Sequence, residues 1–294
     1  MDPDSTSTRV TPDALARLRE WEGRTETLRD EVTSAPVRSL SATLDRDDAQ
    51  PVVGAELPPL WHWLYFLPRH RHSELGDDGH ARLGGFLPPV PLPRRMWAGG
   101  RLQWLAPLHV GDAVERTSRI ASVTHKTGRT GDLVFVVVRH EVRNAAGLAL
   151  TEEHDIVYRA AAQPGDPVPP PQAAPQDAVW SREIVPDPVL LFRYSALTFN
   201  GHRIHYDRSY VTEVEGYPGL IVHGPLIATL LVDLARREQP GRAIKGFSFK
   251  AVRPTFDINA FRVNGRPAAD GKSAQLWAQD HEGWLTMQAD IQFA

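Results

Sequence analysis

The chain has 294 residues, of which 41% are hydrophobic and 23% are charged, and its formal net charge is −3. This is the composition of a globular protein with one large domain or two smaller ones, and it gives no overall attraction to nucleic acid or to an anionic membrane. Because the chain has no cysteine, disulfides, thiolate catalysis and cysteine-ligated metal centres are excluded.

The N-terminal segment carries no targeting signal that the sequence reveals. The first 30 residues are charged and lack the apolar core of a signal peptide. Apolar runs elsewhere are too short, or too often interrupted, to cross a bilayer. We therefore expect a cytoplasmic protein with no membrane and no nucleic-acid partner.

The first half of the chain is expected to be helical at its start and then an antiparallel meander. Thr11-Pro12 is typical of a helix start, and the apolar run 60–66 fits a buried helix or a strand, of which we favour the helix. Residues 84–93 are rich in Gly and Pro and predict a loop. Runs of strand character follow at 114–123, 133–142 and 149–158.

A proline-rich stretch lies near the middle of the chain. Residues 163–176 contain six prolines in fourteen positions, so they cannot pair as a strand or continue a helix. We interpret residues 163–180 as an extended linker. It divides the chain into an N-terminal unit, 1–162, and a C-terminal unit, 181–294.

The same order of elements recurs beyond the linker. An apolar run of helical length, 225–237, precedes segments of strand character at 243–252, 260–263, 274–279 and 284–293. The two units also share a local echo, because 107–114 and 254–261 place Pro, an Asp or Asn, Ala and an apolar residue in the same register. These features favour two copies of one α+β unit.

Polar residues crowd the segment 194–210, where Asn200, His202 and His205 fall within six positions. A histidine with adjacent hydrogen-bonding groups can act as a general base, and His205 is followed closely by Asp207. Most other histidines are expected to be structural or surface residues, including His70, His72, His80, His125 and His281.

A second cluster, Val222-His223-Gly224-Pro225, opens the apolar helix. The first N–H groups of a helix have no intrahelical partner, and the helix dipole favours negative charge there. This is how an oxyanion hole is built. An ordinary helix cap and a helix buried in the core would use the same residues, and both interpretations can hold together.

Other kinds of site are less well supported. His202, His205 and His223 could share a metal ion, but no carboxylate stands as an obvious further ligand, so we expect no metal and no cofactor. Ser195 and Ser209 lack the strained elbow of serine hydrolases, and no Walker loop or dinucleotide fingerprint is present.

The two clusters resemble the hydratase 2 motif of the MaoC-like hotdog hydratases and dehydratases. That motif, Gly-Asp-x-Asn-Pro-Ile-His with a later Val-His-Gly helix start, appears here as Phe199-Asn200-Gly201-His202-Arg203-Ile204-His205 and Val222-His223-Gly224. The stretches 198–207 and 216–225 resemble the double-hotdog branch of mitochondrial-type 3-hydroxyacyl thioester dehydratases and bacterial mesaconyl-C4-CoA and itaconyl-CoA hydratases. Residues 86–100 resemble the N-terminal hotdog domain of that branch.

The resemblance implies an α+β fold, a double hotdog in which two helix-wrapped antiparallel sheets are joined by the Pro-rich linker. It also implies an enzyme, a hydro-lyase that hydrates a 2-enoyl thioester or dehydrates the 3-hydroxyacyl form. The expected substrate is a CoA ester such as mesaconyl-C4-CoA or itaconyl-CoA. The alternative is a 3-hydroxyacyl-[acyl-carrier-protein] of fatty acid metabolism.

Residue by residue, His205 matches the catalytic histidine of the family, and Gly224 matches the glycine whose N–H binds the thioester oxygen. Asn200 stands where the wider family has Asp, and an amide can orient water but cannot exchange a proton at neutral pH. The proton for the α-carbon must then come from His205 itself, through the same water, or from another acid, of which Asp207 is the nearest along the sequence. Possible supporting residues are His202, Asp207 and His223.

Several cations could meet the carrier phosphates or a free carboxylate of the acyl group. The candidates are Arg94, Arg95, Arg203, Lys245, Lys250 and Arg253. Two alternatives from other classes stay open, a hotdog thioesterase and a non-catalytic acyl-thioester binding module. A homo-oligomer is also possible.

Overall fold

The computed structural model of the protein describes residues 10–128, 131–160 and 170–294. The elements before residue 160 are α1 (Pro12–Arg19), β1 (Thr25–Glu31), α2 (Ser34–Thr43), the 3-10 helices η1 (Trp61–Leu64) and η2 (His72–Glu74), β2 (Arg94–Trp104), β3 (Ala113–Gly128), β4 (Gly131–Asn144) and β5 (Gly147–Arg159). Those after residue 170 are β6 (Trp180–Ile184), α3 (Pro188–Leu197), the 3-10 helix η3 (Arg203–His205), the π-helical turn η4 (Tyr210–Val214), α4 (Gly224–Glu238), β7 (Ile244–Ala251), β8 (Phe261–Pro267), β9 (Ser273–Gln279) and β10 (Leu285–Phe293).

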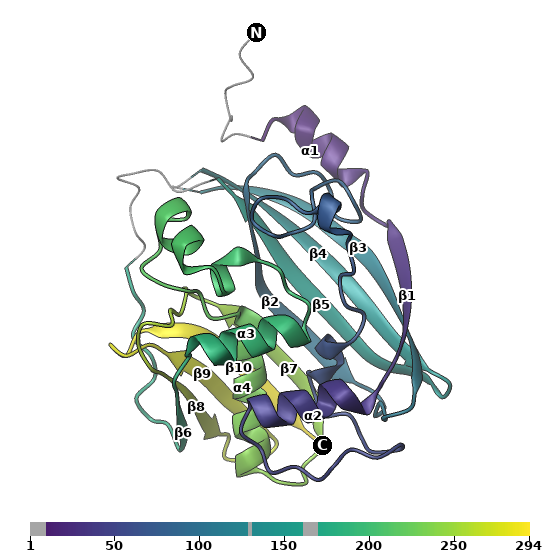
Figure 1. Ribbon diagram of the computed structural model, residues 1–294, viewed down its shortest axis with the longest axis vertical. Helices are drawn as coiled ribbons and strands as arrows, with labels where there is room; N and C mark the ends of the chain where they lie inside the picture. The colour runs from purple at the N-terminus through teal and green to yellow at the C-terminus, as the bar shows by residue number, and fades with distance from the viewer. Residues whose placement is uncertain (1–9, 129–130, 161–169) are drawn as a thin grey trace.

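The ten strands belong to one sheet, in the order β1-β3-β4-β5-β2-β7-β10-β9-β8-β6. N-terminal strands form one half and C-terminal strands the other, while α2 and α3 cross in front of the sheet (Figure 1). Antiparallel pairing of β2 with β7 joins the halves, from Gly99 opposite Lys250 to Gln103 opposite Gly246. This edge-to-edge union is the arrangement expected for a double hotdog.

Helix α4 is the central helix of the C-terminal half. Every residue from Leu226 to Ala235 is buried, and the helix packs on β6, β8, β9 and β10. A helix that is apolar on all sides needs cover on all sides. The same core includes apolar residues of α2, η1 and α3, which close over α4 from the side away from the sheet.

The predicted strands of the first half are the inner parts of the longer strands β3, β4 and β5. The predicted helix in 60–66 forms only the single turn η1, because Leu60 and Phe66 take left-handed backbone angles, φ 70° and 54°, on either side of it. Elements that the pattern analysis did not predict are β1, α2, β2, β6 and α3.

The local echo between the two halves has a structural counterpart. Residues 107–114 follow the seam strand β2 and lead into β3, whereas 254–261 follow the seam strand β7 and lead into β8. Each segment also forms an isolated antiparallel bridge to a distant loop, Glu56 with His109 and Ile221 with Phe256. The two segments therefore hold equivalent places in two related units.

Part of the predicted linker, residues 161–169, lies outside the described residues. Its later part runs beside the C-terminal half, where Ala173 bridges to Trp284 and the buried Trp180 begins β6. The division at 163–180 stays a prediction. Among the residues that the structure describes, no helix is long and apolar enough to cross a membrane.

A buried ion cluster ties α4 to its surroundings. Asp233 of α4 is 1% exposed and contacts Arg46 at 2.5 Å, Arg182 at 3.0 Å and Arg237 at 2.8 Å. Arg46 follows α2 and Arg182 lies on β6, so one carboxylate joins three parts of the fold.

We predict that Asp233→Asn lowers the free energy of unfolding by about 3–5 kcal/mol, because it leaves three guanidinium groups without their shared anion. Guanidinium chloride unfolding of the variant and the parent protein measures the difference. Asp290→Asn, on an exposed position of β10, is the matched control and should change the free energy little. Equal effects of the two substitutions would contradict a stabilising role for the cluster.

Candidate active site

A cavity of about 730 Å³ lies between the two halves of the molecule. Asn200, His202, His205 and Gly224 line it from the C-terminal half, together with the end of β7. The N-terminal half contributes a wall that includes Asp78, His80, Arg95, Trp97 and His154. The two sequence clusters therefore meet in one cavity, as the motif predicts.

His205 is held as a neutral base. Its Nδ1 lies 2.7 Å from the carbonyl oxygen of Ile221, to which it donates, so Nε2 keeps its lone pair. Burial, followed by the nearby ring of His202, lowers the pKa of His205 to about 3. At neutral pH the imidazole can accept a proton from a bound water.

The ring of His223 packs against the ring of His205. The two rings are stacked, with centroids 3.7 Å apart and planes 17° apart. His223 is fully buried, and its Nε2 lies 2.8 Å from Oγ of Ser195 at the end of α3. This hydrogen bond and the stacking hold the plane of the His205 ring.

Gly224 is the first residue of α4 and lines the cavity. A Cβ built on it would meet no atom within 4 Å, so the space in front of it is open to a ligand. Pro225 follows and has no N–H, which leaves the Gly224 N–H as the free donor nearest the helix start. The position suits an oxyanion because the helix dipole adds to this donor.

Asn200 lines the cavity, and its side-chain NH₂ group is available to a ligand there. Its Oδ1 accepts a hydrogen bond of 3.0 Å from the backbone N–H of His202. The backbone N–H of Asn200 donates to the carbonyl of Ser195. The oxygen is therefore engaged in the loop. The NH₂ group is what remains to hold a water or a carbonyl oxygen.

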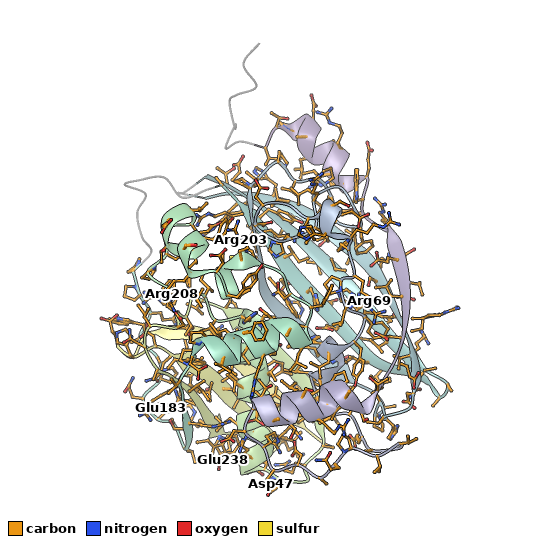
Figure 2. All side chains as sticks on the ribbon, in the orientation of Figure 1. Asp47, Arg69, Glu183, Arg203, Arg208 and Glu238 are labelled. Carbon is orange, nitrogen blue, oxygen red and sulfur yellow. The ribbon has the colours of Figure 1, made fainter. Side chains whose placement is uncertain are left out.

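Asp207 and Arg203 lie outside the cavity lining. Arg203, labelled in Figure 2, pairs with Asp207 at 2.8 Å and stacks over the ring of Tyr210. Backbone and side-chain donors, the Tyr210 N–H first and then Arg203, lower the pKa of Asp207. The Asp207 carboxylate is thus already engaged by these donors, and it caps the turn after His205. The structure does not bring it to the reacting atoms.

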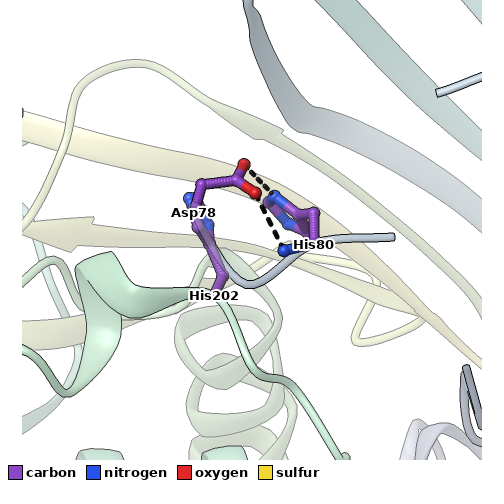
Figure 3. Close-up of side chains that lie close together, drawn as sticks. All are labelled: Asp78, His80 and His202. Carbon is purple, nitrogen blue, oxygen red and sulfur yellow. Dashed lines mark hydrogen bonds and ion pairs between the residues drawn. The ribbon is translucent and has the colours of Figure 1, made fainter. Parts of the chain in front are cut away.

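Asp78 and His80 enter the site from the N-terminal half. Nδ1 of His80 lies 2.9 Å from Oδ2 of Asp78, and the backbone N–H of His80 donates to Oδ1 at the same distance (Figure 3). His80, expected to be a structural or surface residue, instead stacks on His202 with centroids 3.9 Å apart. The Asp-Gly-His sequence at 78–80 is the local signal that could have marked it.

The candidate cations separate into two groups. Arg94, Arg95 and Arg253 line the cavity, but Arg94 is already paired with Glu215 at 3.2 Å. Lys250 is exposed on β7 at the seam, and Lys245 lines a different cavity of about 550 Å³ at the far end of α4. Arg95 is close enough to the catalytic loop to lower the pKa of His202, together with burial and His80.

Asp78, His80 and His202 are also the described residues that come nearest to a metal site. One possible ligand atom from each lies within 4.8 Å of the others (Figure 3). The rings of His80 and His202 lie with their centroids 3.9 Å apart and their planes tilted by 37°.

These observations define a class of protein: a double hotdog whose C-terminal half carries a neutral histidine beside a helix N-terminus, the site of a thioester hydratase or dehydratase. Comparison with known families agrees. The family described as "Hydroxyacyl-thioester dehydratase type 2" matches residues 60–257, and the chain belongs to this family. A hydro-lyase acting on acyl thioesters is therefore confirmed as the enzyme class.

Individual relatives support the same assignment. The mesaconyl-C(4)-CoA hydratase of Chloroflexus aurantiacus is 47% identical over 92% of this chain and 96% of its own. A solved MaoC-like dehydratase superposes with a TM-score of 0.68 at 14% identity, covering 92% of this chain and 98% of that one. A Mycobacterium tuberculosis protein described as having a double hotdog fold gives 0.59 at 12% identity, covering 92% and 96%. The predicted fold is thus confirmed.

We predict that His205 makes the protein sensitive to acid. Its folded pKa, about 3, lies below its ordinary value of 6.5, so the neutral ring stabilises the fold above pH 6.5. That contribution, about 1.4 kcal/mol for each pH unit, is lost as the pH falls from 6.5 toward 3. Denaturant unfolding at pH 7 and pH 5 should show a smaller loss in His205→Gln than in the parent protein. An unchanged loss, or a ring protonated at pH 6 by NMR, would contradict this.

Proposed function

We propose that the protein reversibly hydrates the double bond of a short dicarboxylic enoyl-CoA, with mesaconyl-C4-CoA as the best candidate substrate. The observation that carries this proposal is that His205, whose Nε2 keeps its lone pair, lines the same cavity as the start of α4 at Gly224. The 47% identity to a mesaconyl-C(4)-CoA hydratase over nearly the whole chain supports the acyl group.

In this mechanism Nε2 of His205 takes a proton from water as the water oxygen bonds to the β-carbon. The electrons of the double bond move toward the thioester carbonyl, whose oxygen gains negative charge. The N–H of Gly224 and the dipole of α4 stabilise that charge. Asn200 holds the attacking water through its amide NH₂ group.

Arg95 is the cation best placed for a free carboxylate. In mesaconyl-C4-CoA this carboxylate is attached to the β-carbon, so it lies beside the water that His205 activates. Arg95 lines the cavity near His202 and forms no ion pair with a carboxylate of the described residues, whereas Arg94 is paired with Glu215. An ionic hydrogen bond from Arg95 therefore fits the substrate without breaking an ion pair among the described residues.

CoA is the proposed carrier, and Arg253, which lines the cavity and lies 3.7 Å from an oxygen of Asp280, is the cation proposed for its pantetheine or phosphates. An acyl-carrier-protein thioester of fatty acid metabolism is the second candidate, because the family description covers hydroxyacyl thioesters generally. A cytoplasmic location and a homo-oligomer stay predictions.

We predict that the protein consumes mesaconyl-C4-CoA with loss of the enoyl absorbance and without release of free CoA. His205→Ala should lower kcat by about 10²–10⁴-fold, since it removes the general base. Asn200→Asp should retain activity, because its carboxylate can still hold water. Release of free CoA would indicate a thioesterase, and binding without turnover would indicate a non-catalytic module.

We predict that Arg95→Met lowers kcat/KM for mesaconyl-C4-CoA by roughly 10–100-fold, the worth of a hydrogen bond to a charged group. The same variant should hydrate crotonyl-CoA, which has no free carboxylate, as well as the parent protein does. Arg139→Met, which changes an exposed arginine of β4, is the control. Equal losses on both substrates would show that Arg95 maintains the cavity rather than selecting the acyl group.

A further inference from the structure

We propose that His80, positioned by Asp78, is a second catalytic residue of this site and exchanges the proton at the α-carbon of the substrate. The inference deepens the proposed hydration and rests on it. One proton of the reaction belongs to the water that His205 activates. Either His205 returns its proton to the α-carbon or a second group supplies one; Asn200 cannot, and Asp207 lies outside the cavity lining.

The turn that carries His80 is locked to the catalytic loop by its backbone. The N–H of Arg203 donates to the carbonyl of Asp78 at 2.9 Å. Gly79, at φ 85°, packs so tightly that an added Cβ would lie 1.9 Å from the carbonyl oxygen of Gly201. Contact this close between residues far apart in the sequence makes the turn a fixed part of the active site.

The Asp78–His80 pair has the arrangement of an oriented acid–base histidine. Asp78 holds Nδ1–H of His80 and leaves Nε2 as the exchangeable position. The hydrogen bonds from His80 hold the pKa of Asp78 well below its ordinary range, so a carboxylate anion stands beside the ring. His205 has only a carbonyl as its partner, which suits a neutral base.

The two histidines are separated by one ring. His80 stacks on His202, and His202 meets His205 edge-on with centroids 5.4 Å apart. Burial, with His80 and Arg95 nearby, lowers the pKa of His202 to about 3, so this ring is a neutral spacer. His80, His202 and His205 all line the cavity that would hold the acyl chain.

The step balances without any further reactant. In hydration, the water oxygen bonds to the β-carbon and Nε2 of His205 takes one water proton. The enolate held at Gly224 re-forms its carbonyl as the α-carbon takes a proton from Nε2 of His80. The proton on His205 then returns to His80 through solvent, and the net change is addition of one water.

His80→Asn tests the assignment, because its amide can still donate to Asp78 while the exchangeable ring proton is lost. We expect kcat for mesaconyl-C4-CoA to fall about 10²–10⁴-fold with KM changed little. His72→Asn, on the exposed turn η2 of the same segment, is the matched control and should behave as the parent protein.

Exchange of the α-proton separates the two histidines. The hydrated product is incubated in D₂O with each variant, and deuterium uptake is followed by mass spectrometry. We expect His205→Ala to retain uptake without eliminating water, and His80→Asn to lose it. Loss with His205→Ala and retention with His80→Asn would overturn the proposal, as would a stoichiometric metal ion in the purified protein whose removal by EDTA abolishes turnover.

The outcomes also distinguish this proposal from the one on which it rests. If the parent protein does not hydrate the thioester, the proposed function fails and takes the role of His80 with it. If the parent protein is active and His80→Asn is equally active, only the role of His80 fails.

Discussion

The antiparallel pairing of β2 with β7 is the contact on which the active site depends. It requires very close approach, because a Cβ on Gly99 would lie 2.6 Å from the carbonyl oxygen of Phe249, and one on Gly100 would lie 2.9 Å from Cε1 of the Phe249 ring. Glycine at both positions lets the two sheets continue into one another. The seam then sets the N-terminal wall of the cavity opposite the start of α4, so neither half contains a complete site.

Burial gives the histidines of the site their different capacities. His205 and His223 are deeply buried with neutral partners, a carbonyl and a hydroxyl, and burial is the main cause that lowers the pKa of each. His80 lies nearer the surface, 28% exposed, and has a carboxylate partner. The rings of the site therefore differ in the partners they contact, neutral groups for His205 and His223 and a carboxylate for His80.

Sequence patterns predicted what is local. Alternating apolar residues revealed β3 to β5 and β7 to β10, and the clusters at 200–205 and 223–224 indicated two parts of one site. Strand β2 was missed because prolines precede it and Gly99-Gly100 interrupts it, although tertiary pairing on both sides holds it as a strand. His80 was not predicted as a site residue because its position in the cavity depends on contact with a loop more than 100 residues away in the sequence. Asp207 is close to His205 in sequence, but Arg203, one helical turn earlier, holds it outside.

The amide at position 200 is then a consequence of how the two halves share the chemistry. A carboxylate there would stand beside the backbone N–H of His202 and next to two buried neutral rings, where its charge would need a partner. With Asn200 the loop keeps the same hydrogen bond without that charge. The acid–base function is instead assigned to His80, whose Nδ1 and backbone N–H face the Asp78 carboxylate. Asn200 and the Asp78–His80 pair on the opposite wall therefore belong to one electrostatic arrangement. In the proposed mechanism, each half of the double hotdog handles one proton.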